Sequence, residues 1–337
     1  MRPIVAPAPP DDLQPGPVQT FSIITPAYQA AATIVETVES ALAQTVPAHE
    51  IVVIDDGSTD GTADVLSPYR DRIVYVHQEN RGTPAALNAG VRAATGDFVS
   101  ILDADDVYEP ERIAALTELA QARPDLDILA TDAYLEVNGA VTARFYDATP
   151  FAGERQTVEI VDRCFIAWPA VRRSTLLEHG GYDESLKIAH DWECYLRLLF
   201  NGSRAGAVDE PLMRYRIRGT GSLTDDRVEA LRDRVRMLEG AVLLDPPAEE
   251  RRAIEHHLEL RRRQVLLAET EQALRSHRPD ARRRSLALAA ASGLPVGTRA
   301  RALAAAVAPG LAARRLAALE RQTGHSYAKR ALPDGDE

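Results

Sequence analysis

The fold of this chain is decided by residues 50–62, EIVVIDDGSTDGT. Four consecutive apolar residues, 51–54, end at Asp55 and Asp56, and small polar residues then open a turn that can start a helix. The pattern recurs, with strands predicted at 21–24, 73–76 and 98–102 and helices at 34–42, 83–95 and 110–122. Short apolar strands that alternate with helices indicate an α/β fold with a mostly parallel sheet flanked by helices.

Polar residues gather where these predicted strands end. Residues 25–28, TPAY, follow the first strand, and Asp103 and Asp105 follow the fourth. Ligands of open α/β sheets bind outside the carboxyl ends of the strands, and Mg²⁺ and Mn²⁺ bind carboxylates together with substrate phosphates. From the residues alone an ordinary acidic turn explains Asp103 and Asp105 as well, and a helix-capping turn explains Gly57 and Ser58.

The order of five motifs is more specific than any one of them. They are SIITPAY at 22–28, VVIDDGSTDGT at 52–62, NRG at 80–82 with LNAG at 87–90, ATGD at 94–97, and LDADD at 102–106. Over roughly residues 20–220 the chain resembles the family 2 glycosyltransferases. The resemblance implies a Rossmann-like GT-A fold, a nucleotide-sugar donor and a divalent metal, Mn²⁺ or Mg²⁺.

The resemblance also implies roles for single residues at the donor site. Leu87 departs from the family, which often has Arg at this position. Carried over to this sequence, Pro26 and Tyr28 flank the nucleotide, Asp56 accepts a hydrogen bond from the base with Asp55 beside it, Arg81 contacts the base or diphosphate, Asp103 binds ribose or metal, and Asp105 is the principal metal ligand. Arg218 stands where the family often has His, and it either pairs with the diphosphate or is a solvated loop arginine.

Residues 190–198, HDWECYLRL, resemble the family's acid motif, in which an aspartate at a helix start is the catalytic base. Asp191 fits that position, and a plain helix-start residue is the alternative reading. His190 stands where the family commonly has Glu or another residue. On the acceptor side we expect His190 and Trp168, whose ring could stack on a sugar or pack in the core.

Composition and charge narrow the class of protein. The 337 residues carry a net charge of −11, which argues against a nucleic-acid binder that works by bulk charge. Two cysteines cannot form a disulfide framework. The charge is uneven, with −15 on residues 1–224 and +4 on residues 225–337. An acidic N-terminal part followed by a weakly basic C-terminal part suggests two regions with different functions.

These observations predict three parts. Residues 1–19 form a disordered, proline-rich arm, and residues 20–224 form the GT-A domain, with a nucleotide-sugar half at about 20–110 and an acceptor half at about 111–224. Residues 225–337 form a helical C-terminal extension. Its arginines either belong to a solvated face paired with Glu or contact anionic lipid or a partner protein.

The leading hypothesis is a metal-assisted, inverting glycosyltransferase with an aspartate base. A UDP-sugar donor is favoured, with GDP or dTDP as alternatives, and the acceptor hydroxyl belongs to a saccharide, a lipid-linked molecule or a small molecule. A sugar nucleotidyltransferase would need a lysine in a basic loop near the first strand, and the first lysine is Lys187. A non-catalytic nucleotide-sugar-binding module stays open. Without an apolar leader or span, we expect a cytoplasmic protein, with peripheral contact at the inner face of the membrane as an option.

Overall fold

The computed structural model of the chain describes residues 2–217 and 226–323. The chain folds as two units, Met1–Leu223 and Thr224–Glu337. This division lies one residue from the predicted limit of the GT-A domain at residue 224. The two units are described separately below.

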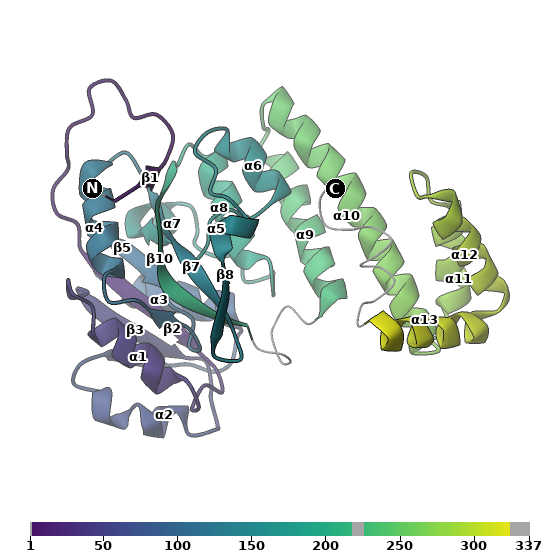
Figure 1. The fold of residues 1–337 in the computed structure, drawn as a ribbon, viewed down its shortest axis with the longest axis horizontal. Helices are drawn as coiled ribbons and strands as arrows, with labels where there is room; N and C mark the ends of the chain where they lie inside the picture. The colour runs from purple at the N-terminus through teal and green to yellow at the C-terminus, as the bar shows by residue number, and fades with distance from the viewer. Residues whose placement is uncertain (1, 218–225, 324–337) are drawn as a thin grey trace. The chain divides into compact units, whose positions relative to one another are not determined.

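The first unit is built on one ten-stranded sheet (Figure 1). Its strand order is β1-β10-β7-β9-β5-β2-β3-β4, with β6 added to β10 and β8 added to β7. The strands are β1 Ile4–Val5, β2 Phe21–Ala27, β3 Glu50–Asp55, β4 Val74–His77, β5 Phe98–Ile101, β6 Val107–Tyr108, β7 Ile128–Val137, β8 Ala140–Arg144, β9 Ala170–Arg172 and β10 Ala205–Ile217.

The sheet is mixed rather than mostly parallel. Strands β5, β2, β3 and β4 run parallel, as the sequence predicted, and β7 runs parallel to β10. The short strand β9 is antiparallel to both β5 and β7, and so joins the two parallel groups. The α/β class with a sheet flanked by helices is confirmed, and the antiparallel strands are a finding that strand periodicity alone did not predict.

Helices cover both faces of the parallel group. Phe21 and Ile23 of β2 share a buried core with residues of α1 and α4, whereas Ile24 points to the opposite face because side chains alternate along a strand. There α3 approaches closely: a Cβ on Gly90 would lie 2.4 Å from Ile24 Cγ2. The helices are α1 Ile34–Leu42, α2 Thr62–Val65, α3 Thr83–Ala93, α4 Arg112–Ala122, α5 Phe145–Ala148, α6 Gln156–Asp162, α7 Arg173–Glu178 and α8 His190–Phe200, with a 3₁₀ turn at Ser67–Tyr69.

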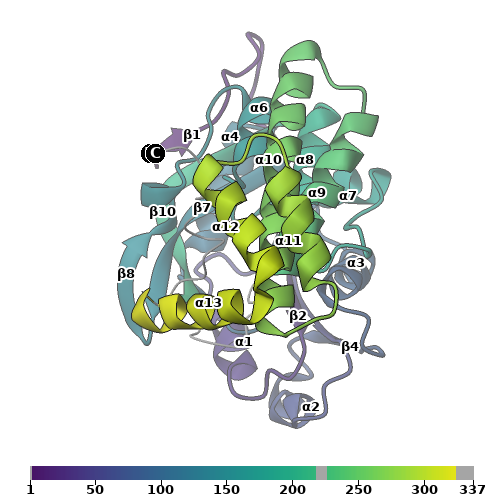
Figure 2. The same ribbon diagram turned by 90° about the vertical axis from the view of Figure 1, so that its right-hand side faces the viewer.

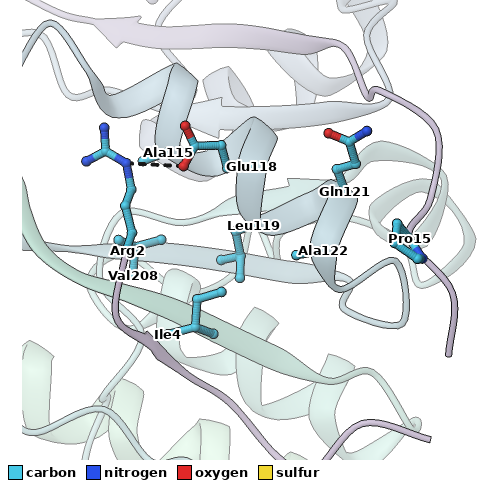
Figure 3. A pocket seen from close by; sticks show the side chains of 9 residues that line it. All are labelled: Arg2, Ile4, Pro15, Ala115, Glu118, Leu119, Gln121, Ala122 and Val208. Atoms are coloured by element: carbon cyan, nitrogen blue, oxygen red, sulfur yellow. Dashed lines mark ion pairs between the residues drawn. The ribbon is translucent and has the colours of Figure 1, made fainter.

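The N-terminal arm is ordered, contrary to the disorder predicted for residues 1–19. Strand β1 adds to the edge of the sheet, with Ile4 opposite Val208 of β10. Arg2 pairs with three glutamates, including Glu118 of α4, beside a cavity of about 310 Å³ (Figure 3). The composition misled because a proline-rich segment needs no core of its own when a sheet edge supplies its backbone partners.

The second unit is helical, as predicted (Figure 2). Its helices are α9 Arg227–Leu243, α10 Ala248–Arg275, α11 Ala281–Ala290, α12 Val296–Val307 and α13 Pro309–Thr323. One buried cluster joins Leu231 of α9, Leu267 of α10, Leu288 of α11 and Ala302 of α12. None of the helices in the described residues combines the length and apolar character needed to cross a lipid bilayer.

Candidate active site

Three of the predicted polar segments leave the sheet at one edge. Ala27 lies opposite Asp55 in the β2–β3 ladder, and Ile24 lies opposite Ile101 in the β2–β5 ladder. The residues that follow these parallel strands therefore meet at the carboxyl edge, where open α/β sheets bind their ligands.

Asp55 is fully buried at the end of β3 and its oxygens are occupied by protein groups. Oδ1 accepts a hydrogen bond from the Ser58 amide at 2.9 Å, and Oδ2 accepts one from the Tyr75 hydroxyl. The His77 ring lies 3.3 Å from Oδ2. Burial acts to raise the pKa of Asp55, but the hydrogen bonds from Tyr75 and Ser58 outweigh it and hold the pKa below its usual value. Asp55 thus fixes the turn after β3.

Asp56 fixes the loop that leads into α3. Its Oδ1 accepts hydrogen bonds from Gln78 Nε2 at 2.7 Å and from the Arg81 amide at 3.0 Å, and its Oδ2 accepts one from the Gly82 amide at 2.8 Å. A carboxylate has about four acceptor positions. The protein therefore fills three of them, and one is left for the base that the sequence predicted as a partner.

The residues predicted to surround the nucleotide differ in their exposure to solvent and in their protein partners. Pro26 lies in β2 and is half-buried, whereas Tyr28 directly after the strand is 55% exposed. The Arg81 guanidinium donates a 2.7 Å hydrogen bond to Glu184 Oε2. A diphosphate bound by Arg81 would have to replace or share this partner.

Asn88 joins the donor side of the domain to the turn at residues 180–184. Its Oδ1 accepts a hydrogen bond from the Tyr182 amide at 2.8 Å, and its Nδ2 donates to the Tyr182 carbonyl at 2.8 Å and to Glu184 Oε1 at 3.1 Å. Gly181 has φ +70°, and a Cβ there would lie 2.3 Å from Asn88 Oδ1. Neither Asn88 nor Glu184 was among the residues that the sequence placed at the site, and nothing in the local sequence marked Glu184.

The loop after β5 holds a cluster of carboxylates, in which Asp103 and Asp105 are half-buried. Burial and then the charges of Asp105 and Asp191 raise the pKa of Asp103 to about 7, although a hydrogen bond from the Trp168 side chain lowers it. Asp103 and Asp105 of the loop and Asp191 of α8 thus lie close enough for the charges of the other two to act on Asp103. Asp103, Asp105 and Asp191 are three of the residues that the sequence placed at the site.

Asp106 belongs to the same cluster and was not assigned a role from the sequence. It is fully buried, and its Oδ1 accepts a 2.9 Å hydrogen bond from the Arg216 amide. Its Oδ2 has no hydrogen-bond partner among the described residues. Burial and the nearby Asp103 raise the pKa of Asp106 well above its usual value. The LDADD motif contained this residue, but its burial becomes visible only in the fold.

Asp191 approaches the cluster from the first turn of α8. Its side chain is exposed, and its Oδ1 accepts a 2.7 Å hydrogen bond from the Trp192 amide. The neighbouring His190 is buried, and its ring meets the Tyr182 ring edge-on at 6.2 Å between centroids. Asp191 is therefore the more accessible of the two to a ligand.

Trp168 and Tyr215 form an aromatic wall beside the acids. Their ring centroids lie 4.6 Å apart. Burial and the charges of Asp106, Asp103, Asp105 and Asp191 raise the pKa of Tyr215 to about 12, which shows that all four carboxylates are near it. Trp168 is half-buried with φ +41°, in the left-handed region, and its carbonyl accepts a hydrogen bond from buried Arg112.

The donor set suits a hard divalent cation that shares its ligands with a phosphate. Asp103 and Asp105 offer carboxylate oxygens, and a cation would relieve the repulsion that raises the pKa of Asp103. Within residues 2–217 and 226–323 no three His, Cys, Asp or Glu side chains are arranged to hold a metal by themselves. The remaining ligands would have to come from the substrate, as is usual for Mg²⁺ at phosphates.

The structure therefore brings Asp103, Asp105, Asp191 and Trp168 together. It places Asp55 and Asp56 at the carboxyl end of β3, which β2 separates from β5 in the sheet. Arg218 lies outside the described residues. Tyr215 and Arg112 were missed by sequence reasoning because they reach the site from β10 and α4, far away in the chain.

Comparisons with known proteins give the family and the fold. The family model "Glycosyl transferase family 2" matches residues 22–180. The succinoglycan biosynthesis protein ExoU of Rhizobium meliloti is 35% identical over 201 residues, which cover 54% of this chain and 57% of ExoU. The chain spans less than two thirds of the length of the curated relatives it matches most strongly.

Solved structures share the fold. S. aureus TarS 1–349 in complex with UDP-GlcNAc has a TM-score of 0.59 at 20% identity, with 91% of this chain and 93% of that chain covered. The mannosyltransferase PcManGT of Pyrobaculum calidifontis, in complex with GDP-Man and Mn²⁺, has a TM-score of 0.57 at 22% identity, with 95% and 86% covered. These likenesses establish the GT-A fold. The motifs and the match over residues 22–180 thus place this part of the chain in glycosyl transferase family 2.

Proposed function

We propose that this chain transfers a sugar from a nucleoside diphosphate donor to an acceptor hydroxyl with inversion at the anomeric carbon. The observation that carries the proposal is the grouping of Asp103, Asp105 and Asp191 beside Trp168 and Tyr215. Structures with this fold contain UDP-GlcNAc or GDP-Man, which supports a nucleotide-sugar donor. A UDP-sugar is our first choice, and a saccharide, lipid-linked or small-molecule hydroxyl is the acceptor.

Each of these side chains has a proposed task. Asp191 takes the proton of the acceptor hydroxyl, which is a poor nucleophile until it is deprotonated. One Asp191 oxygen is held by the Trp192 amide, which orients the carboxylate. Trp168 and His190 line the acceptor side, and Tyr28 and Asp56 bind the nucleotide. Attack from the side opposite the leaving diphosphate inverts the anomeric carbon.

A divalent cation held by Asp103 and Asp105 would supply neutralising charge for the diphosphate leaving group. The PcManGT complex with Mn²⁺ supports this choice of cofactor. Arg81 would add a second positive charge after releasing Glu184.

The test separates binding from turnover. The first step is a thermal-shift screen of UDP-, GDP- and dTDP-sugars with Mn²⁺, followed by release of nucleoside diphosphate with a panel of acceptors. We expect Asp191→Asn to bind the donor normally and to lose roughly 10²- to 10⁴-fold in turnover. Asp105→Asn should lose Mn²⁺-dependent binding measured by calorimetry.

Asp147→Asn, at an exposed aspartate outside the cluster, is the matched control and should behave as wild type. Donor binding without any diphosphate release would identify a non-catalytic binding module. Release of pyrophosphate from a nucleoside triphosphate and a sugar phosphate would identify a nucleotidyltransferase. Near-normal turnover of Asp191→Asn would reject Asp191 as the base.

A further inference from the structure

The charged residues of the last three described helices are almost all arginines. Between Asp280 and Glu320 there are seven arginines and no lysine, aspartate or glutamate, in a protein whose net charge is −11. The arginines are 282, 283 and 284 on α11, 299 and 301 on α12, and 314 and 315 on α13. A local excess of this size creates a strongly positive surface on an acidic protein.

The arginines of the two preceding helices behave differently. Arg232 pairs with Glu269, Arg262 with Glu239 and Arg275 with Glu271, so their charges are balanced locally. This matches the solvated, Glu-paired face that the sequence offered as one reading. Paired arginines of this kind are ordinary helix-surface chemistry.

On α11 and α13 only part of the positive charge is balanced by ion pairs. Arg284 of α11 pairs with Asp280 and Glu269. For Arg282, Arg283, Arg314 and Arg315, the described residues provide no carboxylate within ion-pair distance. Within the described part of the chain, no ion pair therefore neutralises the positive charge at these four positions.

The same three helices expose aliphatic side chains. They are Leu286 at 48% exposure, Val296 at 81%, Leu303 at 53%, Val307 at 77% and Leu311 at 57%. Single exposed apolar residues are ordinary, but a group on neighbouring helices marks a contact surface. Figures 1 and 2 both show α11 and α12 side by side, with α13 running crosswise near one end of this pair.

Helical spacing puts the arginines and the aliphatic residues on common faces. On α11, Leu286 is three and four residues after Arg283 and Arg282, and on α13, Arg314 and Arg315 are three and four residues after Leu311. Residues three or four apart are neighbours on a helix surface. Each exposed leucine is thus flanked by guanidinium groups about one turn away.

Helix α12 repeats the arrangement along its length. Val296, Arg299, Leu303 and Val307 follow at intervals of three and four residues, which keeps them on one side of the helix. We call these four residues, together with Arg282, Arg283, Leu286, Leu311, Arg314 and Arg315, the basic-apolar face. An apolar cavity of about 260 Å³ lies next to it, and Leu311 and Arg315 line part of that cavity.

We propose that the basic-apolar face binds the surface of a lipid bilayer that contains anionic lipids. The aliphatic side chains enter the boundary between headgroups and acyl chains, and the arginines pair with the phosphates. A membrane surface fits both features at once. A nucleic acid would use the arginines but would leave the valines and leucines without apolar partners. The proposal does not depend on the proposed transferase activity.

The test is flotation of the full chain with vesicles, with no catalytic readout. We expect recovery with vesicles of equal parts phosphatidylcholine and phosphatidylglycerol, and none with phosphatidylcholine alone. Arg314→Ala/Arg315→Ala should weaken binding roughly tenfold or more, because each arginine near an anionic surface contributes about fivefold. Val296→Ser/Val307→Ser should also weaken it roughly tenfold. Added salt should reduce recovery through screening.

The matched control is Arg251→Ala/Arg262→Ala, which removes two arginines of α10 that pair with Asp245 and Glu239. It changes the net charge by the same amount and should bind like wild type. Equal binding by this control and by Arg314→Ala/Arg315→Ala would overturn the proposal. So would full binding by the valine variant, recovery with neutral vesicles, or binding to a DNA duplex with no binding to anionic vesicles.

Discussion

Trp168 has a backbone conformation that an L-amino acid with a large side chain rarely adopts. Its φ of +41° lies in the left-handed region, which costs roughly 1–2 kcal/mol for residues other than glycine. Buried Arg112 donates a hydrogen bond to its carbonyl, and Tyr215 packs against its ring at 4.6 Å. The surrounding contacts thus hold Trp168 in a strained conformation beside the acid cluster. Backbone strain of this kind is often found at functional sites.

Two substitutions at this position should separate strain from packing. Trp168→Ala and Trp168→Gly remove the same ring contacts, but only glycine adopts positive φ without penalty. We therefore expect Trp168→Gly to be more stable than Trp168→Ala by roughly 1 kcal/mol in urea unfolding. At Gln121, an exposed residue of α4, the order should reverse because glycine weakens helices. A Trp168→Ala variant at least as stable as Trp168→Gly would show that the backbone carries no strain.

Tyr75 should make the stability of the domain depend on acid pH through Asp55. The pKa of Asp55 in the folded protein is lowered, so its contribution is complete above the ordinary aspartate pKa and is lost as the pH falls through the folded value. Tyr75→Phe removes a hydrogen bond that lowers this pKa. We expect a loss of about 1.5–3 kcal/mol in the free energy of unfolding at pH 7, and a smaller loss at pH 3.

Tyr69→Phe is the matched control for Tyr75→Phe. The Tyr69 hydroxyl bonds to Glu39 on the exposed surface, so its removal should change stability little at either pH. Denaturant unfolding of the three proteins across this pH range provides the measurement. A Tyr75→Phe deficit that stays constant from pH 7 to pH 3 would rule out the linkage to Asp55.

Single residues of the site were predictable to different degrees. Asp103 and Asp105 could be found because they follow an apolar strand, and strand ends define the ligand edge. Glu184 could not, because its partners Arg81 and Asn88 lie 103 and 96 residues away in the chain. Arg112 looks like an ordinary surface residue at the start of a helix, and only the fold shows that it is fully buried.

At the scale of elements, apolar runs predicted the long strands, but the connection between the two halves of the sheet was not predictable. Strand β9 has three residues, Ala170–Arg172, and pairs with β5 and β7, which lie far away in sequence. Three residues are too few for an alternating pattern to emerge. Pairing with both neighbours, rather than local propensity, makes this segment a strand.

The turn at residues 180–184 should tolerate no side chain at Gly181. Its φ is +70° and a Cβ would lie 2.3 Å from Asn88 Oδ1, whereas Gly202 has φ +92° with nothing within 4 Å. Both glycine-to-alanine changes strain the backbone, but only Gly181→Ala also displaces Asn88. We expect Gly181→Ala to lose roughly 1–3 kcal/mol more than Gly202→Ala in denaturant unfolding. Equal losses would mean that Asn88 does not anchor the turn.

At the scale of the whole molecule, the two units have separate cores and carry different surface chemistry. The acid cluster lies in the first unit, and the basic-apolar face lies in the second. The division of charge was readable from the sequence, because −15 and +4 fall on the two sides of residue 224. Which arginines lack partners was not readable, since pairing on α9 and α10 depends on how those helices pack.

Because the two units have separate cores, we expect them to unfold in separate transitions, each of which responds to a different ligand. Differential scanning calorimetry of the full chain should show two transitions, because each unit buries its own apolar cluster. UDP with Mn²⁺ should raise the transition temperature of the first unit only. It should stabilise that unit by about 2.7 kcal/mol when the free ligand concentration is a hundred times its Kd. Anionic vesicles should raise the transition temperature of the second unit only, since the basic-apolar face belongs to that helical unit. A single transition that responds to both ligands would show that the two units unfold as one.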